Sequence, residues 1–155
     1  MNLSEYILED RIISNLKSSV NNEVITELLI RLQKLSIISE KIKLESILRN
    51  SEYIIDKRIV FLHCQSIETN SLITILGLSK KGMNFNCPAN QLSNLVLLTL
   101  SPTISPNIHR KFLSRFKLMI SNNNIKTKII NATNAKSIAN TIFNWDKEEQ
   151  NISNI

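Results

Sequence analysis

The chain has 155 residues, of which 43% are hydrophobic and 21% are charged. This length suits one domain with a single sizeable core, and the composition excludes a disordered chain. A net charge of +6 would suit nucleic acid, an anionic membrane or an acidic protein as partner. The Lys and Arg residues form no dense run, however, and no aromatic residues alternate with them, so generic basicity is the better interpretation.

The cysteines and the opening segment indicate the compartment. Cys64 and Cys87 lack the spacing of metal ligands and cannot define a disulfide framework, so we expect free thiols. The opening segment MNLSEYILEDRII has acidic residues where a secretion signal needs positive ones, and no apolar run approaches a membrane span. We therefore expect a cytoplasmic protein with no metal, no cofactor and no membrane insertion.

The first third of the chain predicts short elements followed by two helices. A helical turn is expected over residues 3–8 and an edge strand over residues 11–16. The next segment predicts an amphipathic helix from Glu23, which Ser19 or Asn21 can cap and whose buried stripe is Ile25, Leu28, Leu29, Leu32 and Leu35. A second helix is predicted to start at a Ser39 cap and to end at Asn50, with an apolar face of Leu44, Ile47 and Leu48.

Three apolar runs follow and predict strands over residues 58–63, 71–78 and 94–101. The last run is almost continuously apolar, which is typical of a central strand with helices on both faces. The segment SKKGMNF, residues 79–85, predicts a tight hairpin. Together these elements predict a single-domain α/β fold with a mixed, mostly parallel sheet between helices.

The final third predicts further helix. Ser105 followed by Pro106 is a strong start signal for a helix, because proline is favoured at the first helical position. The buried stripe of that helix would be Ile108, Phe112, Phe116, Met119 and Ile120. The polar segment SNNN then leads into residues 125–130, and a last helix spans about residues 134–145. The end should fray, so residues 1–146 form the predicted domain and residues 147–155 a tail.

The two histidines are the candidate functional residues. His63 ends a predicted strand, and ligands of open α/β sheets gather outside the carboxyl ends of strands. His109 falls near the start of a helix, where backbone N–H groups and the helix dipole favour an anion. If these positions meet, two imidazoles would face one anionic group. A neutral imidazole is a competent nucleophile near pH 7, so attack on a phosphoryl donor is a suitable reaction.

An interpretation of each histidine without a chemical role stays open. A histidine that ends an apolar strand is more often a half-buried residue, and one on a helix is more often simply exposed. Cys64 is a weaker candidate, since adjacent strand residues point to opposite faces and direct activation by His63 is not expected.

The segment LSKKGMNFNCPANQLSNLVLLTLSPTISPNIHRKFLSRF resembles enzyme IIA domains of the bacterial phosphotransferase system, of the fructose, mannitol and nitrogen-regulatory type. The resemblance is carried by an apolar strand, Leu95 to Leu100, and by the residues Lys81, Gly82, Met83, Phe85, Pro88, Ser101, Pro102 and His109. The opening of the chain is similar to that of the family as well, so the likeness covers nearly the whole sequence.

The resemblance implies roles for both histidines and a partner. His63 corresponds to the phosphoryl-accepting histidine, and His109 to the second histidine that lines the same site. The implied partner is a small histidine-containing phosphocarrier protein. Since the chain shows neither a membrane segment nor a second domain, the nitrogen-regulatory branch is favoured, in which phosphorylation changes binding to regulated targets such as a transporter or a sensor kinase. The oligomeric state stays open.

The chain also departs from the family pattern. Ile54, Asp56 and Arg58 stand where the family has a glycine-rich approach, and Leu62 replaces the proline before the histidine. Asp56 would repel a phosphoryl group, whereas Arg58 would compensate as a donor. These departures motivate an alternative, a degenerate IIA-like binding module that no longer carries phosphate. Nucleic-acid binding is a third and weaker hypothesis.

Overall fold

The computed structural model describes residues 1–66 and 69–153. Five strands form one sheet in the order β1-β4-β5-β3-β2, and they are β1 (Ile12–Ile13), β2 (Ile54–Asp56), β3 (Ile59–Ser66), β4 (Ile73–Met83) and β5 (Ser93–Pro102). β1 runs parallel to β4, and β3 runs parallel to β5. The β2–β3 and β4–β5 pairs are antiparallel. The predicted mixed sheet is therefore confirmed, with β1 at one edge as expected.

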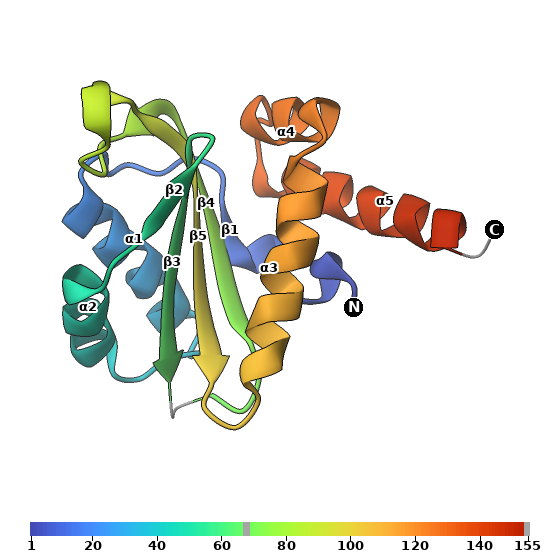
Figure 1. The fold of residues 1–155 in the computed structure, drawn as a ribbon. Helices are drawn as coiled ribbons and strands as arrows, with labels where there is room; N and C mark the ends of the chain where they lie inside the picture. The colour runs from blue at the N-terminus through green and yellow to red at the C-terminus, as the bar shows by residue number, and fades with distance from the viewer. Residues whose placement is uncertain (67–68, 154–155) are drawn as a thin grey trace.

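Helices cover both faces of this sheet (Figure 1). One layer holds α1 (Asn21–Lys34) and α2 (Lys41–Asn50). The other layer holds α3 (Pro106–Ile120), with α4 (Asn123–Ile130) and α5 (Ala135–Ser153) beyond it. Short 3-10 turns lie at η1 (Leu3–Glu5), η2 (Glu9–Arg11) and η3 (Pro88–Asn90). Among the residues that the structure describes, no helix is both long enough and apolar enough to cross a bilayer.

The alternation of side chains along β3 divides the core in two. Val60, Leu62 and Cys64 pack in the cluster under α1 and α2, while Ile59 and Phe61 belong to the cluster under α3. β5 lies between β3 and β4 and is buried from Leu95 to Leu100, which confirms the predicted central strand. Because successive strand residues point to opposite faces, His63 follows Phe61 onto the α3 side and Cys64 points away from it.

The starts of α1 and α2 differ from the predicted caps, whereas α3 starts at Pro106 after Ser105 as predicted. Val20 and Glu40 occupy the N-cap positions of α1 and α2, and neither makes a capping bond through its side chain. Ser19, Asn21 and Ser39, which were predicted as caps, therefore do not occupy the N-cap positions. The amphipathic stripes explain why both helices still form there, since buried leucines hold each helix against the sheet without a cap.

The connection between β4 and β5 also differs from expectation. β4 continues to Met83 and residues 84–92 with η3 lead to β5, so residues 79–85 do not form a tight hairpin. Gly82 adopts a φ of +96° close to a register shift in this pair, a conformation that a side chain would disfavour.

The C-terminal segment is helical where fraying was expected, because α5 continues to Ser153. Asp146 accounts for part of this order. Its carboxylate is 2% exposed and accepts the backbone N–H groups of Leu3 at 3.1 Å and Ser4 at 2.7 Å. It also lies 3.5 Å from the guanidinium of Arg115. These contacts fasten α5 to η1 and to α3.

Candidate functional site: a stacked histidine pair at the end of the sheet

His63 occupies the polar end of a row of apolar side chains on the α3 side of the sheet. Its neighbour in this row, Phe61, packs edge-on against Phe116 of α3 with 6.0 Å between ring centroids. The parallel register places His63 level with Thr99 of β5, and Ser101 level with Gln65. Three polar side chains, those of His63, Thr99 and Ser101, therefore gather where the two strands end.

His109 completes the group from α3. The helix begins at Pro106, directly after β5, so its first turn lies close to the strand ends. The imidazole rings of His63 and His109 are stacked, with 3.7 Å between centroids and 13° between planes. The structure thus brings together the two histidines that the sequence singled out, although 46 positions of sequence separate them. Both rings are half-buried.

Two buried hydroxyls hold the imidazoles, and sequence reasoning missed both. Nε2 of His63 lies 2.7 Å from Oγ of Ser101, and Nε2 of His109 lies 2.9 Å from Oγ1 of Thr99. Thr99 also donates to the carbonyl of Leu62 at 3.4 Å, which leaves its oxygen to accept an N–H from His109. The available signal was the alternation of Thr99 and Ser101 in an otherwise apolar strand. We use the name histidine site for His63, His109, Thr99 and Ser101.

The electrostatics of the histidine site favour neutral rings. Burial lowers the pKa of His63 below its ordinary value. Burial, followed by the charge of His63, lowers the pKa of His109 to about 4. Among the described residues, no carboxylate pairs with either ring to oppose this trend. Both imidazoles therefore keep a free lone pair at neutral pH, which a nucleophile needs.

The stacking also restricts where an anion can bind. Rings 3.7 Å apart are in van der Waals contact, so no anion fits between their faces. A group bonded to a ring nitrogen lies in the plane of that ring, beyond its edge. The expectation that two imidazoles face one anionic group therefore takes a specific form: an anion on His63 would lie along the edges of the stacked pair.

The residues that replace the family glycines lie away from the histidine site. Lys57 and Arg58, both with positive φ, form the turn between β2 and β3. Asp56 pairs with Ile59, four residues before His63, which corresponds to about 13 Å along the strand. The expectations that Asp56 repels a phosphoryl group and that Arg58 replaces a donor are therefore wrong, because both residues lie at the opposite end of β3.

Two further residues of the approach have other partners. Leu62, in place of the family proline, is buried under α1 and α2. Arg49, near the end of α2, pairs with Glu45 and donates to Thr26 at 3.0 Å. These contacts join α2 to α1 and occupy the guanidinium of Arg49.

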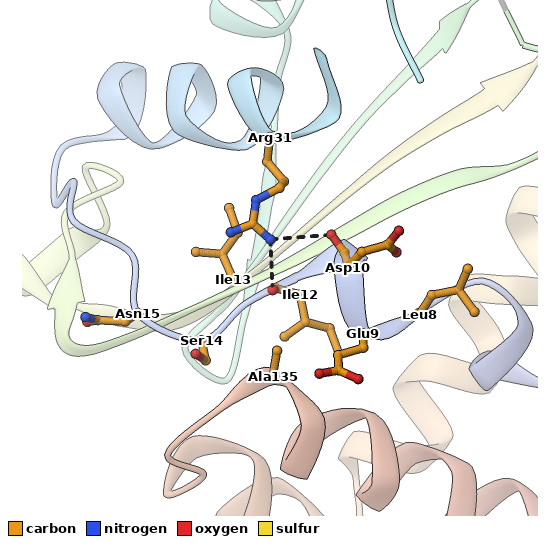
Figure 2. A pocket seen from close by; sticks show the side chains of 9 residues that line it. All are labelled: Leu8, Glu9, Asp10, Ile12, Ile13, Ser14, Asn15, Arg31 and Ala135. Carbon is orange, nitrogen blue, oxygen red and sulfur yellow. Dashed lines mark hydrogen bonds between the residues drawn. The ribbon is translucent and has the colours of Figure 1, made fainter. Parts of the chain in front are cut away.

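A separate pocket of about 700 Å³ lies beside the edge strand β1 (Figure 2). Arg31 of α1 reaches into it and donates to the carbonyls of Asp10 and Ile12, each at 3.5 Å. The pocket has no histidine in its lining. Among the described residues, no three His, Cys, Asp or Glu side chains lie close enough together to hold a metal ion.

Comparison with known proteins places the chain in a family. Residues 5–145 match the family described as phosphoenolpyruvate-dependent sugar phosphotransferase system, EIIA 2. No protein of curated function matches the sequence.

Solved structures share the fold. Nitrogen Regulatory Protein IIA-Ntr from Neisseria meningitidis superposes with a TM-score of 0.78 at 13% identity, covering 90% of this chain and 98% of its own. The mannitol-specific cryptic phosphotransferase enzyme IIA CmtB from Escherichia coli gives 0.68 at 19% identity, covering 92% and 98%. The complex of enzyme IIAMtl and phosphorylated enzyme IIBMtl from Escherichia coli gives 0.69 at 11% identity, covering 87% and 95%. Since the family match extends over residues 5–145 of 155, the chain belongs to the EIIA 2 family of the phosphoenolpyruvate-dependent sugar phosphotransferase system.

Proposed function

We propose that His63 accepts a phosphoryl group from a histidine-containing phosphocarrier protein and that His109 supports it from the stacked position. The observation that carries the proposal is the pair of half-buried, hydroxyl-bonded imidazoles at the end of β3. Membership of a phosphotransferase family supports it. A solved relative of the same fold is a complex with a phosphorylated partner, enzyme IIBMtl, which supports a role in phosphoryl exchange between proteins.

The transfer needs no reagent beyond the two proteins. A neutral ring nitrogen of His63 attacks phosphorus, and a new N–P bond forms as the N–P bond of the carrier histidine breaks. The electron pair of the broken bond stays on the carrier nitrogen, which leaves as neutral imidazole when the other nitrogen of that ring is protonated. The His63 ring then carries the positive charge and loses its ring proton to water. Transfer of this kind depends mainly on positioning and on donors for the phosphoryl oxygens.

The histidine site supplies positioning and candidate donors. The Ser101 hydroxyl, next to Nε2 of His63, fixes the ring in the resting state and can turn to donate to a phosphoryl oxygen. Ser105 is the N-cap of α3 but its side chain makes no capping bond, and the first turn holds no acidic residue, so no carboxylate of that turn offsets the positive end of the helix dipole. A negative group at the edge of the histidine pair is favoured by that dipole.

The proposal extends to regulation in the cytoplasm. A phosphorylated His63 adds negative charge beside the exposed start of α3, and such a charge change alters docking of other proteins. We propose that the chain acts in this way as a nitrogen-regulatory IIA-type switch on target proteins such as a transporter or a sensor kinase. The choice of the nitrogen-regulatory branch rests on the resemblance in sequence; IIA-Ntr shares the fold, and so do the mannitol IIA proteins.

The alternative function is a IIA-like binding module that no longer carries phosphate. One observation favours it: Leu62 stands directly before His63, where the family has a proline. The half-buried, facing imidazoles count against it.

Incubation with phosphoenolpyruvate and the general phosphotransfer proteins of the same organism distinguishes a phosphoryl carrier from a binding module. The expected result is a gain in intact mass of one phosphoryl group, labile to acid as a phosphohistidine is, and lost in the His63→Ala variant. His109→Ala should still accept phosphate but more slowly. An unchanged mass, under conditions where the carrier itself is phosphorylated, would reject the carrier function and leave the binding module.

A further inference from the structure

Five cations lie together at the end of the sheet that is opposite the histidine site. Figure 1 shows the β2–β3 turn and α4 at this end, and the ends of β3 and β5 with the start of α3 at the other. The cations belong to three elements, which are the β2–β3 turn, the end of β4 and α4. We call this group the cationic end, and it consists of Lys57, Arg58, Lys80, Lys81 and Lys126.

Hydrogen bonds hold these elements side by side. The ammonium of Lys126 donates to the carbonyl of Lys57 at 2.7 Å, which ties α4 to the turn. Asn94 of β5 joins the turn to β4, because its backbone N–H donates to the carbonyl of Arg58 and its side chain to that of Ser79, both at 3.0 Å. Only two strand spacings, about 10 Å, separate β3 from β4. The charges of the three elements therefore act together on a surface laid across this end.

Little negative charge offsets the cationic end. Among the described residues, none of its five members forms an ion pair. Burial, followed by the charge of Lys57, lowers the pKa of Lys126, and Arg58 adds to this effect while Asp56 opposes it. Repulsion among the cations thus exceeds the attraction of Asp56, and the end presents a positive surface.

The conformation of the β2–β3 turn indicates a role for its side chains beyond folding. Lys57 and Arg58 have φ values of +50° and +68°, and they form a two-residue loop between paired Asp56 and Ile59. Asn and Gly are favoured in such a turn because they adopt positive φ at little cost. The chain places two long cationic side chains there instead, and disfavoured backbone conformations of this kind gather at functional sites.

A bilayer with anionic headgroups suits this end better than a protein or a nucleic acid. Such a surface attracts each cation presented to it and needs no matching pocket. Phe61 of β3 and Phe85 of the β4–β5 connection are buried, so they serve neither as anchors for a protein nor as platforms for bases. Leu92 is 45% exposed and lies against Gly82, next to Lys81, where its apolar side chain can enter the headgroup region.

We infer that the cationic end binds anionic phospholipid headgroups reversibly and holds the protein at the surface of a bilayer. Because the histidine site lies at the opposite end of the sheet, it faces away from the lipid and stays open to other proteins. The inference does not depend on phosphoryl transfer, since it assigns a second binding surface that shares no residue with the histidine site.

The test compares two double variants that each remove two positive charges. Lys57→Asn/Arg58→Gly introduces the residues that the turn favours, so it should fold at least as stably as wild type. Lys34→Gln/Lys111→Gln is the control, because both lysines are exposed and lie at the end of α1 and near the start of α3. Sedimentation of the full chain with vesicles measures binding at low and high salt. The vesicles contain phosphatidylglycerol with phosphatidylcholine, or phosphatidylcholine alone.

The expected result is specific to the cationic end. Wild type should bind the anionic vesicles at low salt and should not bind phosphatidylcholine alone. One cation near an anionic leaflet strengthens binding about fivefold, so Lys57→Asn/Arg58→Gly should bind about 25-fold more weakly. The control should stay within about threefold of wild type, since its charges lie beyond the screening length from the lipid. High salt should weaken the binding of wild type and control.

Other outcomes would overturn the inference. Absence of wild-type binding to the anionic vesicles at low salt would do so directly. Equal weakening in the two variants, with both shown to be folded by circular dichroism, would indicate attraction by net charge alone. Tighter binding to duplex DNA, or to polyglutamate as a model of an acidic protein, than to the anionic vesicles would assign the cationic end to another class of partner. Each of these results leaves phosphoryl transfer to His63 untouched.

Discussion

The hydroxyl of Thr99 lies 2.9 Å from Nε2 of His109, and this contact joins the central strand β5 to the first turn of α3. Thr99 is also level with His63 on the neighbouring strand. One buried side chain therefore stands next to both histidines and helps to set the position of one ring over the other.

Replacing Thr99 with valine keeps the shape but removes the hydroxyl. Nε2 of His109 then loses its partner in a half-buried site, so we expect the free energy of unfolding to fall by about 1–2 kcal/mol. Denaturant unfolding measures this loss, and Thr103→Val, at an exposed position, is the matched control. Imidazole nitrogen shifts of His109 should move in Thr99→Val and not in the control. Unchanged shifts would contradict the contact.

Stability should decrease on mild acidification. The folded-state pKa of His109, about 4, lies below its ordinary value of 6.5, so between these values the unfolded chain binds more protons than the folded chain. Unfolding then becomes easier as the pH falls, and the stabilisation is fully present above about pH 6.5. Urea unfolding of wild type and His109→Asn from pH 7.5 to pH 4.5 measures the effect. The free energy of unfolding should change less with pH in His109→Asn than in wild type. Parallel pH dependences of the two proteins would count against a depressed pKa of His109.

Phosphorylation of His63 should raise the pKa of His109. In the free protein, burial and the charge of His63 hold this pKa low. A negatively charged phosphoryl group at the edge of the stack favours the protonated form of the neighbouring ring and reverses part of that shift. NMR titration of His109 before and after phosphorylation gives the comparison. A pKa that does not change would place the phosphoryl group away from His109.

Asp146→Asn should destabilise the whole domain. The variant removes the charge that Arg115 meets and one of the oxygens that accept the N–H groups of Leu3 and Ser4. Because the carboxylate is almost fully buried, we expect a loss of about 2–4 kcal/mol in the free energy of unfolding. Asp10→Asn, whose side chain is 55% exposed, should change it little. Calorimetry of both variants measures the difference.

Local patterns predicted the parts of the fold that depend on neighbours in sequence. The stripe of Ile25, Leu28, Leu29 and Leu32 predicted α1, and the continuous apolar run of β5 predicted a central strand, because burial of a periodic face decides both. The meeting of His63 and His109 was predicted from their places at a strand end and a helix start and from the resemblance. Their roles remain a proposal.

Other features depend on contacts between distant residues, and no local pattern reports them. Asp146 looks like a surface carboxylate in sequence, since its partners are backbone groups at the other end of the chain. Ser101 and Thr99 resemble ordinary strand residues until the parallel register places them against the imidazoles. The sequence did not show that the residues in place of the family glycines lie far from His63. That depends on the turn at Lys57 and Arg58, which lies at the other end of β3.

The parallel register of β3 and β5 also protects the histidine site against misassembly. A slip of β3 by one residue would send His63 under α1 and bring Cys64 to α3, since side chains alternate between faces. The same slip would force Val60 and Leu62 out of their apolar cluster. Apolar side chains on the opposite face of β3 from His63 thus fix the register that aligns the two imidazoles.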